Sequence, residues 1–145
     1  MTEEILALDN IRIADRAVSR DEAIREAGGI LVAAGAVDAA YLDSMLEREG
    51  SVSTYMGNYL AIPHGTNEGK GAIKRSALSF VRYPEAVDWN GNEVRFVVGI
   101  AGIENEHLEI LSKIAIVFSD EDEVRKLLDA DTEEAIAALL AEVNA

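Results

Sequence analysis

The order of the periodic segments constrains the fold most strongly, because helical patterns occupy both ends of this chain and extended patterns its middle. Residues 76–83, ended by Pro84, and residues 93–101 predict two strands, and the turn sequence Asp88–Gly91 between them favours antiparallel pairing. This order predicts an α/β fold, in which residues 1–145 form a single domain with a central mixed β-sheet flanked by α-helices.

Apolar side chains in residues 93–101 predict a strand that is buried on both sides. Val94, Phe96, Val98 and Ile100 alternate and so share one face, whereas Val97 lies on the other. A shorter extended segment is expected at residues 6–14, where apolar and polar residues alternate loosely.

Two helices are expected before residue 51. Ser19–Glu22 is a capping box and begins a helix that ends near Gly35. Asp38 can cap a second helix, which runs to about Glu49. Two glycines inside the first helix, at positions 28 and 29, each cost about 1 kcal/mol relative to alanine, and close packing against a neighbour would explain them.

The last forty residues predict three helices. The first begins near residue 104 or 105, and its residues 108–118 are apolar nearly all round, so we expect it to be buried. A short helix restarts at Ser119–Asp120, and the capping box Asp131–Glu134 begins the last one. That last helix has an apolar stripe formed by Ile136, Leu139, Leu140 and Val143.

Composition excludes several classes of function. The chain has no cysteine, which excludes disulfides, thiolate metal sites and cysteine nucleophiles. A net charge of -14 disfavours nucleic acid and anionic lipid as partners and favours a basic protein. No apolar run approaches the ~20 residues that span a bilayer, and the start is acidic, so a cytoplasmic protein without direct membrane insertion is expected.

The segment Leu60–Thr66 is the strongest candidate for a functional site. A short apolar run ends in Pro63-His64-Gly65, where the proline stiffens the backbone and the glycine permits a sharp turn and a close approach. His64 is therefore held at the end of a buried strand. A neutral imidazole is a good nucleophile near pH 7, and we interpret His64 as a phosphoryl carrier.

Other residues could support that chemistry without a cofactor or a metal ion. His107 lies in the first turn of a predicted helix, where free N–H groups and positive potential favour an anion. Arg48 is the candidate cation, Thr54 and Thr66 could supply hydroxyl groups, and Lys70 is a further possibility. These residues could also have no role in catalysis. His64 would then be a histidine in a turn, His107 a histidine at a helix end, Arg48 a surface charge, and the others ordinary loop residues.

The segment Gly57–Thr66, with its Ala-Ile-Pro-His-Gly core, closely resembles the phosphorylation site of the mannitol/fructose class of enzyme IIA in the bacterial phosphotransferase system. Residues 92–101, followed by Asn105-Glu-His-Leu-Glu-Ile-Leu111, resemble the second half of that active site. The resemblance covers the whole chain, and the sequence of these motifs is most similar to the mannitol type. The motif departs mildly at Tyr59-Leu60, where Gly-Ile or Gly-Val is common in relatives.

The resemblance implies a chain of phosphoryl transfers. The small carrier protein HPr would phosphorylate His64, with Nε2 as the favoured nitrogen. His64 would pass the group to a cysteine of a mannitol-type IIB domain in the IICB permease, for uptake of a sugar alcohol, and the resemblance implies mannitol. His107 would stabilise the phosphoryl group, and Arg48 would stabilise its charge. The family fold is a mixed sheet flanked by helices.

Two alternatives remain open from the sequence. The chain could resemble the nitrogen-related IIA proteins, in which phosphorylation switches binding to other proteins. It could instead be a metal-binding or hydrolytic protein, with His64, His107 and Glu106 as zinc ligands. Adjacent positions on a helix do not share a face, so Glu106 and His107 are poorly placed as joint ligands.

Overall fold

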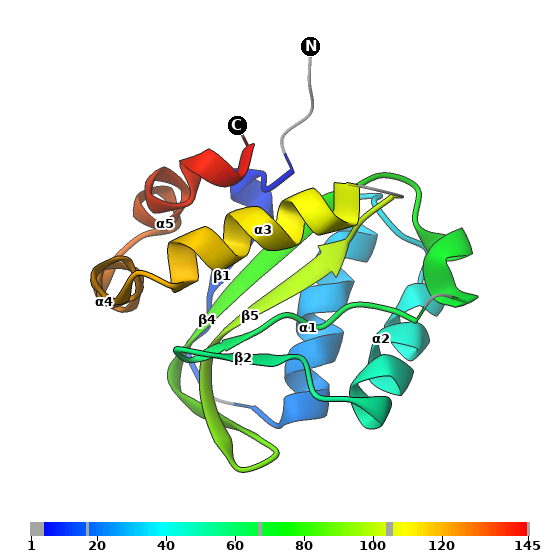
Figure 1. Cartoon of the computed structure of the whole chain (residues 1–145), viewed down its shortest axis with the longest axis horizontal. Helices are drawn as coiled ribbons and strands as arrows, with labels where there is room; N and C mark the ends of the chain where they lie inside the picture. Colours follow the sequence, from blue (N-terminus) through cyan, green and yellow to red (C-terminus); the bar gives the residue numbers. More distant parts are fainter. Residues whose placement is uncertain (1–4, 17, 67, 104–105, 145) are drawn as a thin grey trace.

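The computed structural model describes residues 5–16, 18–66, 68–103 and 106–144, and its centre is a five-stranded mixed sheet (Figure 1). The strands lie in the order β1-β4-β5-β3-β2. They are β1 (Ile11–Ile13), β2 (Tyr55–Gly57), β3 (Leu60–Ala61), β4 (Ala77–Trp89) and β5 (Asn92–Ala101). β4 and β5 pair antiparallel, β1 is parallel to β4, β3 is parallel to β5, and β2 is antiparallel to β3. The predicted mixed sheet is confirmed.

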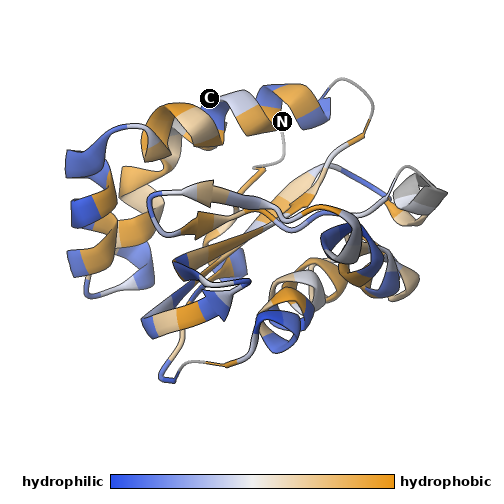
Figure 2. Ribbon diagram, turned by 60° about the horizontal axis from the view of Figure 1, so that its bottom comes forward, coloured by the Kyte–Doolittle hydropathy of each residue, from blue (hydrophilic) through white to orange (hydrophobic). Residues whose placement is uncertain are grey.

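Helices cover both faces of this sheet (Figure 2). The helices are α1 (Arg20–Ala33), α2 (Ala40–Ser51), α3 (Glu106–Phe118), α4 (Glu121–Asp129) and α5 (Glu133–Leu139). Short 3₁₀ segments lie at Leu8–Asn10, Glu68–Ala72 and Ala141–Asn144. Within the described ranges, no helix is long and apolar enough to cross a membrane.

Two hydrophobic cores lie on opposite faces of the sheet because alternate strand residues point to opposite sides. One core packs α3, α4 and α5 against side chains that include Phe80, Phe96 and Ile100. The other packs α1 and α2 against side chains that include Val81 and Val97. The predicted burial of residues 93–101 on both sides is confirmed, although Val94 belongs to the second core and not to the face of Phe96.

The sequence predicted that Pro84 ends a strand. This prediction is wrong, because β4 continues to Trp89. The pairing of β4 with β5 is irregular between Arg82 and Val87. A proline is tolerated in such an irregularity because its missing N–H breaks no regular ladder.

The apolar sequence of α3 predicted burial on all sides, and this prediction is wrong. Ile110, Ile114, Val117 and Phe118 face the core, but Leu108 and Ile116 are each 66% exposed. The sheet offers α3 one face to pack against, so the opposite apolar residues stay at the surface.

The predicted N-cap of α1 is confirmed, and the predicted N-caps of α2 and α5 are each wrong by one residue. Ser19 caps α1 by accepting a hydrogen bond from the Glu22 N–H. α2 has Ala39 and not Asp38 at its N-cap, and α5 is capped by Thr132 and not by Asp131. The extended segment expected at residues 6–14 is a 3₁₀ turn followed by the short β1.

Candidate functional site

His64 lies at the carboxyl end of β3, beside the carboxyl end of β5. The Ile100 N–H donates to the Pro63 carbonyl at 3.0 Å, and His64 forms a parallel bridge with Ile100. On the other side, the Ile62 N–H donates to the Thr54 carbonyl at 3.1 Å. The backbone that leads to His64 is therefore bonded on both sides, as expected for a strand inside a sheet.

The turn after His64 is held by two side chains of α2. The Gly65 N–H donates to the Tyr41 hydroxyl at 2.9 Å, and that hydroxyl donates to the Ile100 carbonyl at 2.8 Å. The Thr66 N–H donates to Ser44 Oγ at 2.8 Å. A Cβ on Gly65 would lie 2.5 Å from Tyr41 Cε1, so the close approach requires glycine. Sequence reasoning identified the glycine but missed Tyr41 and Ser44.

A backbone carbonyl fixes the tautomer of the His64 ring. Nδ1 lies 2.8 Å from the Ile62 carbonyl oxygen. A carbonyl oxygen can only accept, so Nδ1 carries the proton in the neutral ring and Nε2 carries the lone pair. The lone pair of Nε2 is thus not used by this hydrogen bond, and the orientation of the ring is set by its own backbone.

His107 lies next to His64, as the sequence predicted. The ring centroids are 5.2 Å apart, and the ring planes are inclined by 57°. His107 is the second residue of α3, so the start of that helix faces the His64 region. Gly102 permits this arrangement, because a Cβ there would lie 2.6 Å from both Cα and Cβ of His107.

Arg48, the predicted cation, lies in the last turn of α2. Its Nη1 donates to the Val52 carbonyl at 2.8 Å. The pKa of His64 is lowered from its ordinary value, mainly because burial disfavours the charged ring. The Ile62 hydrogen bond opposes this effect, the positive charge of Arg48 lowers the pKa further, and the negative charge of Glu49 raises it. Arg48 is therefore close enough to act on His64 electrostatically.

The two predicted hydroxyl groups are both engaged in local hydrogen bonds. Thr54 is buried, and its Oγ1 donates to Glu49 Oε1 at 2.6 Å. Thr66 Oγ1 lies 3.0 Å from Ser44 Oγ and accepts from the Gly69 N–H at 3.2 Å. Their roles in phosphoryl binding stay predictions. The side chain of Lys70 lies outside what the structure describes.

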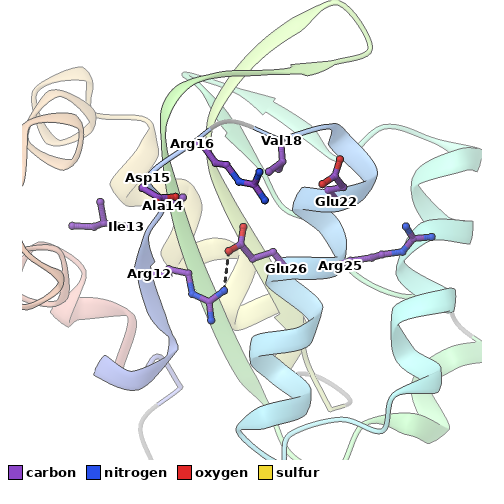
Figure 3. A pocket seen from close by; sticks show the side chains of 9 residues that line it. All are labelled: Arg12, Ile13, Ala14, Asp15, Arg16, Val18, Glu22, Arg25 and Glu26. Carbon is purple, nitrogen blue, oxygen red and sulfur yellow. Dashed lines mark hydrogen bonds and ion pairs between the residues drawn. The ribbon is translucent and has the colours of Figure 1, made fainter.

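The described part of the chain holds a cavity away from His64 but no cluster of metal-ligating side chains. No group of three His, Asp or Glu side chains there is placed to hold a metal ion. A cavity of about 690 Å³ lies by β1, the edge strand opposite β2 (Figure 3). Its lining has three arginines and three acidic residues, including the 2.8 Å ion pair of Arg12 and Glu26, and none of the predicted site residues.

Comparison with known proteins identifies the family. Residues 4–143 match the sequence model of the phosphoenolpyruvate-dependent sugar phosphotransferase system EIIA 2 family. The chain belongs to this family. As an EIIA 2 member it is a phosphotransferase component, in agreement with the resemblance of the His64 and His107 segments.

Relatives of about one-half identity are bacterial proteins named mannitol-specific phosphotransferase enzyme IIA component. The protein of Halalkalibacterium halodurans is 49% identical over 144 residues, with 99% of each chain covered. That of Geobacillus stearothermophilus is 50% identical over 145 residues, with 99% of this chain and 100% of the relative covered.

Solved structures of EIIA 2 type share the fold. Enzyme IIA mannitol of Escherichia coli, in its complex with phosphorylated enzyme IIB mannitol, has a TM-score of 0.86 and 34% identity, and the match covers 94% of this chain and 96% of that one. The nitrogen regulatory protein IIA-Ntr of Neisseria meningitidis has a TM-score of 0.81 and 31% identity, over 94% and 96% of the two chains. The mixed sheet with helices on both faces, expected from the sequence, is confirmed by these structures.

Proposed function

We propose that this chain is a mannitol-type IIA phosphocarrier in which His64 is the phosphorylated residue. The observation that carries the proposal is the His64 ring itself, with Nδ1 bonded to the Ile62 carbonyl at 2.8 Å and Nε2 left with the lone pair. A lowered pKa keeps this ring neutral near pH 7, which a nitrogen nucleophile requires.

The reaction is an exchange of one bond to phosphorus for another. The Nε2 lone pair attacks the phosphorus of phospho-HPr, the bond between phosphorus and the donor nitrogen breaks, and its electron pair stays on the donor ring. In the second transfer, a IIB thiolate attacks the same phosphorus and the bond to Nε2 breaks. Little covalent assistance is needed, so the protein contributes position and charge.

Three groups around His64 suit a transferring phosphoryl group. The start of α3 offers N–H groups and positive potential, and His107 lies in its first turn. Arg48 supplies a positive charge that acts on His64. We assign phosphoryl stabilisation to His107 and charge stabilisation to Arg48. The hydroxyls of Thr54 and Thr66 stay secondary candidates, since both already bond to neighbours.

The proposed partners are HPr as donor and a mannitol-type IIB domain as acceptor, with the reaction taking place in the cytoplasm. Identity near one half to mannitol-specific IIA proteins supports the choice of mannitol. Leu108, next to His107, and Val52, whose carbonyl binds Arg48, are large apolar side chains that are 66% and 61% exposed. Such residues beside the site suit transient docking of another protein.

The test is intact mass after incubation with phosphoenolpyruvate, enzyme I and HPr. Wild type should gain one acid-labile phosphoryl group of roughly 80 Da, and His64→Ala should gain none. Addition of a mannitol IIB domain should then discharge the phosphorylated protein. If wild type gains no mass while the upstream proteins are active, the phosphocarrier proposal is wrong.

The same experiment separates a regulatory function from transport. The fold similarity to a nitrogen regulatory IIA protein makes that alternative concrete. A regulatory protein would accept the phosphoryl group from HPr but would not transfer it to a mannitol IIB domain. Rapid transfer to IIB favours the transport role, and stable phosphorylation in the presence of active IIB favours the regulatory one.

A further inference from the structure

Glu49 is a buried carboxylate close to the candidate site. Only 2% of the residue is exposed, and three donors bind it. Oε2 accepts from the Thr54 N–H at 2.8 Å and from Trp89 Nε1 at 2.9 Å, and Oε1 accepts from Thr54 Oγ1 at 2.6 Å. Burial of a charge without partners would be strongly unfavourable, so the fold must provide these three donors to keep the carboxylate buried.

Glu49 connects to the reacting ring through Thr54 and two hydrogen bonds made by Ile62, one to the Thr54 carbonyl and one to the His64 ring. The carboxylate holds Thr54 by both its N–H and its hydroxyl. The Thr54 carbonyl accepts from the Ile62 N–H at 3.1 Å, and the Ile62 carbonyl in turn binds His64 Nδ1 at 2.8 Å. The peptide groups that flank Ile62 thus link the carboxylate to the histidine ring.

The same segment also holds the candidate cation. Val52, two residues before Thr54, provides the carbonyl that binds Arg48 Nη1 at 2.8 Å. Residues 52–54 leave the end of α2 and lead into β2, so they have little regular structure of their own. An anchor at Thr54 therefore restricts both the Val52 carbonyl and the Ile62 peptide.

We infer that Glu49 is a positioning residue for phosphoryl transfer: it anchors residues 52–54, which orient Arg48 on one side and His64 on the other. The inference rests on the proposed function of His64. Glu49 makes no hydrogen bond to the His64 ring in the described structure, so its hydrogen bonds act on that ring through Thr54. Misplacement by about 1 Å of groups that align a reaction can reduce the rate by about 10²-fold.

The variant Glu49→Gln distinguishes the effect of the Glu49 hydrogen bonds from the effect of its negative charge. The amide oxygen can accept from the Thr54 N–H and Trp89 Nε1, and the amide NH₂ can donate to Thr54 Oγ1, because a hydroxyl can also accept. All three contacts survive while the charge is lost. Glu49→Ala removes the contacts, and Thr54→Val removes only the hydroxyl contact. Asp43→Ala, at an exposed acidic residue of the same helix, is the control.

The measurement is single-turnover transfer from phospho-HPr to each variant, with folding checked by circular dichroism. We expect Glu49→Ala to lower kcat by about 10- to 100-fold with KM within about twofold, and Thr54→Val to lower it by a smaller factor. Glu49→Gln and Asp43→Ala should retain kcat within about threefold. Wild-type kcat in folded Glu49→Ala would overturn the inference. Equal losses in Glu49→Gln and Glu49→Ala would also overturn it, because charge would then carry the effect.

A second readout does not require transfer. The ring ¹⁵N shifts of His64 report which nitrogen carries the proton. In wild type Nδ1 should be protonated, and in Glu49→Ala the two nitrogens should move toward similar shifts as the Ile62 carbonyl loses its fixed position. If Glu49→Ala does not fold, Thr54→Val and Trp89→Phe are used in its place. Inactive wild type would refute the proposed function alone, whereas unchanged ring shifts in these variants would refute the positioning role.

Discussion

The lowered pKa of His64 predicts how its reactivity depends on pH. Burial is the largest cause, and the free histidine value is about 6.5, so the ring in the folded protein is protonated only below that pH. Phosphoryl acceptance should therefore stay flat from pH 8 down to about 6.5 and fall only at lower pH. An NMR titration of the free protein measures the pKa directly and avoids the pH dependence of the donor.

Arg48→Gln is the matched variant for this titration. The positive charge of Arg48 lowers the pKa of His64, so its removal should raise that pKa toward the ordinary value. The acid limb of the transfer rate should then move to higher pH. A His64 pKa at or above about 6.5 in wild type, or a downward shift in Arg48→Gln, would contradict the electrostatic picture.

Gly102 controls the distance between the two histidines. An added Cβ would lie 2.6 Å from His107 Cα and 3.0 Å from its backbone nitrogen, and the start of α3 would have to move. We expect Gly102→Ala to destabilise the protein by about 1–3 kcal/mol and to slow transfer to His64. Denaturant unfolding and single-turnover transfer measure the two effects. A variant with wild-type transfer would show that the position of His107 does not matter.

The sequence located the turn that carries His64 better than it predicted the surroundings of that turn. The Pro63-His64-Gly65 turn has a mechanism that is visible locally, and the structure places His107 and Arg48 near it. Glu49 was missed because its partners, Thr54 and Trp89, meet it only after the chain folds. Next to Arg48 in a helical segment, it has the sequence pattern of an ordinary surface charge.

Helix α1 contains two adjacent glycines with opposite expected behaviour. A Cβ on Gly28 would collide with Leu42 Cδ2 and lie 2.9 Å from Met45 Sδ, both on α2, whereas a Cβ on Gly29 meets nothing within 4 Å. Gly28→Ala should destabilise by about 1–3 kcal/mol, and Gly29→Ala should stabilise by about 0.5–1 kcal/mol. Denaturant unfolding of the two variants provides the comparison, and equal effects would contradict the packing of α1 on α2.

The strands and helices were predictable where periodicity alone decides them and not where tertiary pairing does. The long β5 and the start of α1 follow from alternation and from the Ser19 cap. Pro84 indicated a strand end because the irregular pairing opposite it cannot be read from one strand. The apolar sequence of α3 indicated full burial because sequence does not distinguish a core residue from a surface residue that serves a partner.

The net charge of -14 makes the whole molecule an acidic partner for any basic docking surface. Salt shortens the range of this attraction, since the Debye length falls from about 30 Å at 0.01 M to about 8 Å at 0.15 M. If the docking face of HPr is basic, kcat/KM for transfer from phospho-HPr should fall by roughly tenfold over this range, while kcat stays constant.

Two charge reversals distinguish the net charge from its distribution in this experiment. Glu47 lies one residue before Arg48, and Glu85 lies in the irregular part of β4. Both are exposed, and each Glu→Lys change raises the net charge by two. Charge near the docking site acts most strongly at short range, so Glu47→Lys should lower kcat/KM at low salt more than Glu85→Lys. Equal effects would mean that only the total charge steers association. A kcat/KM that does not fall with salt would mean that apolar contacts, such as those of Leu108, bring the partners together without electrostatic help.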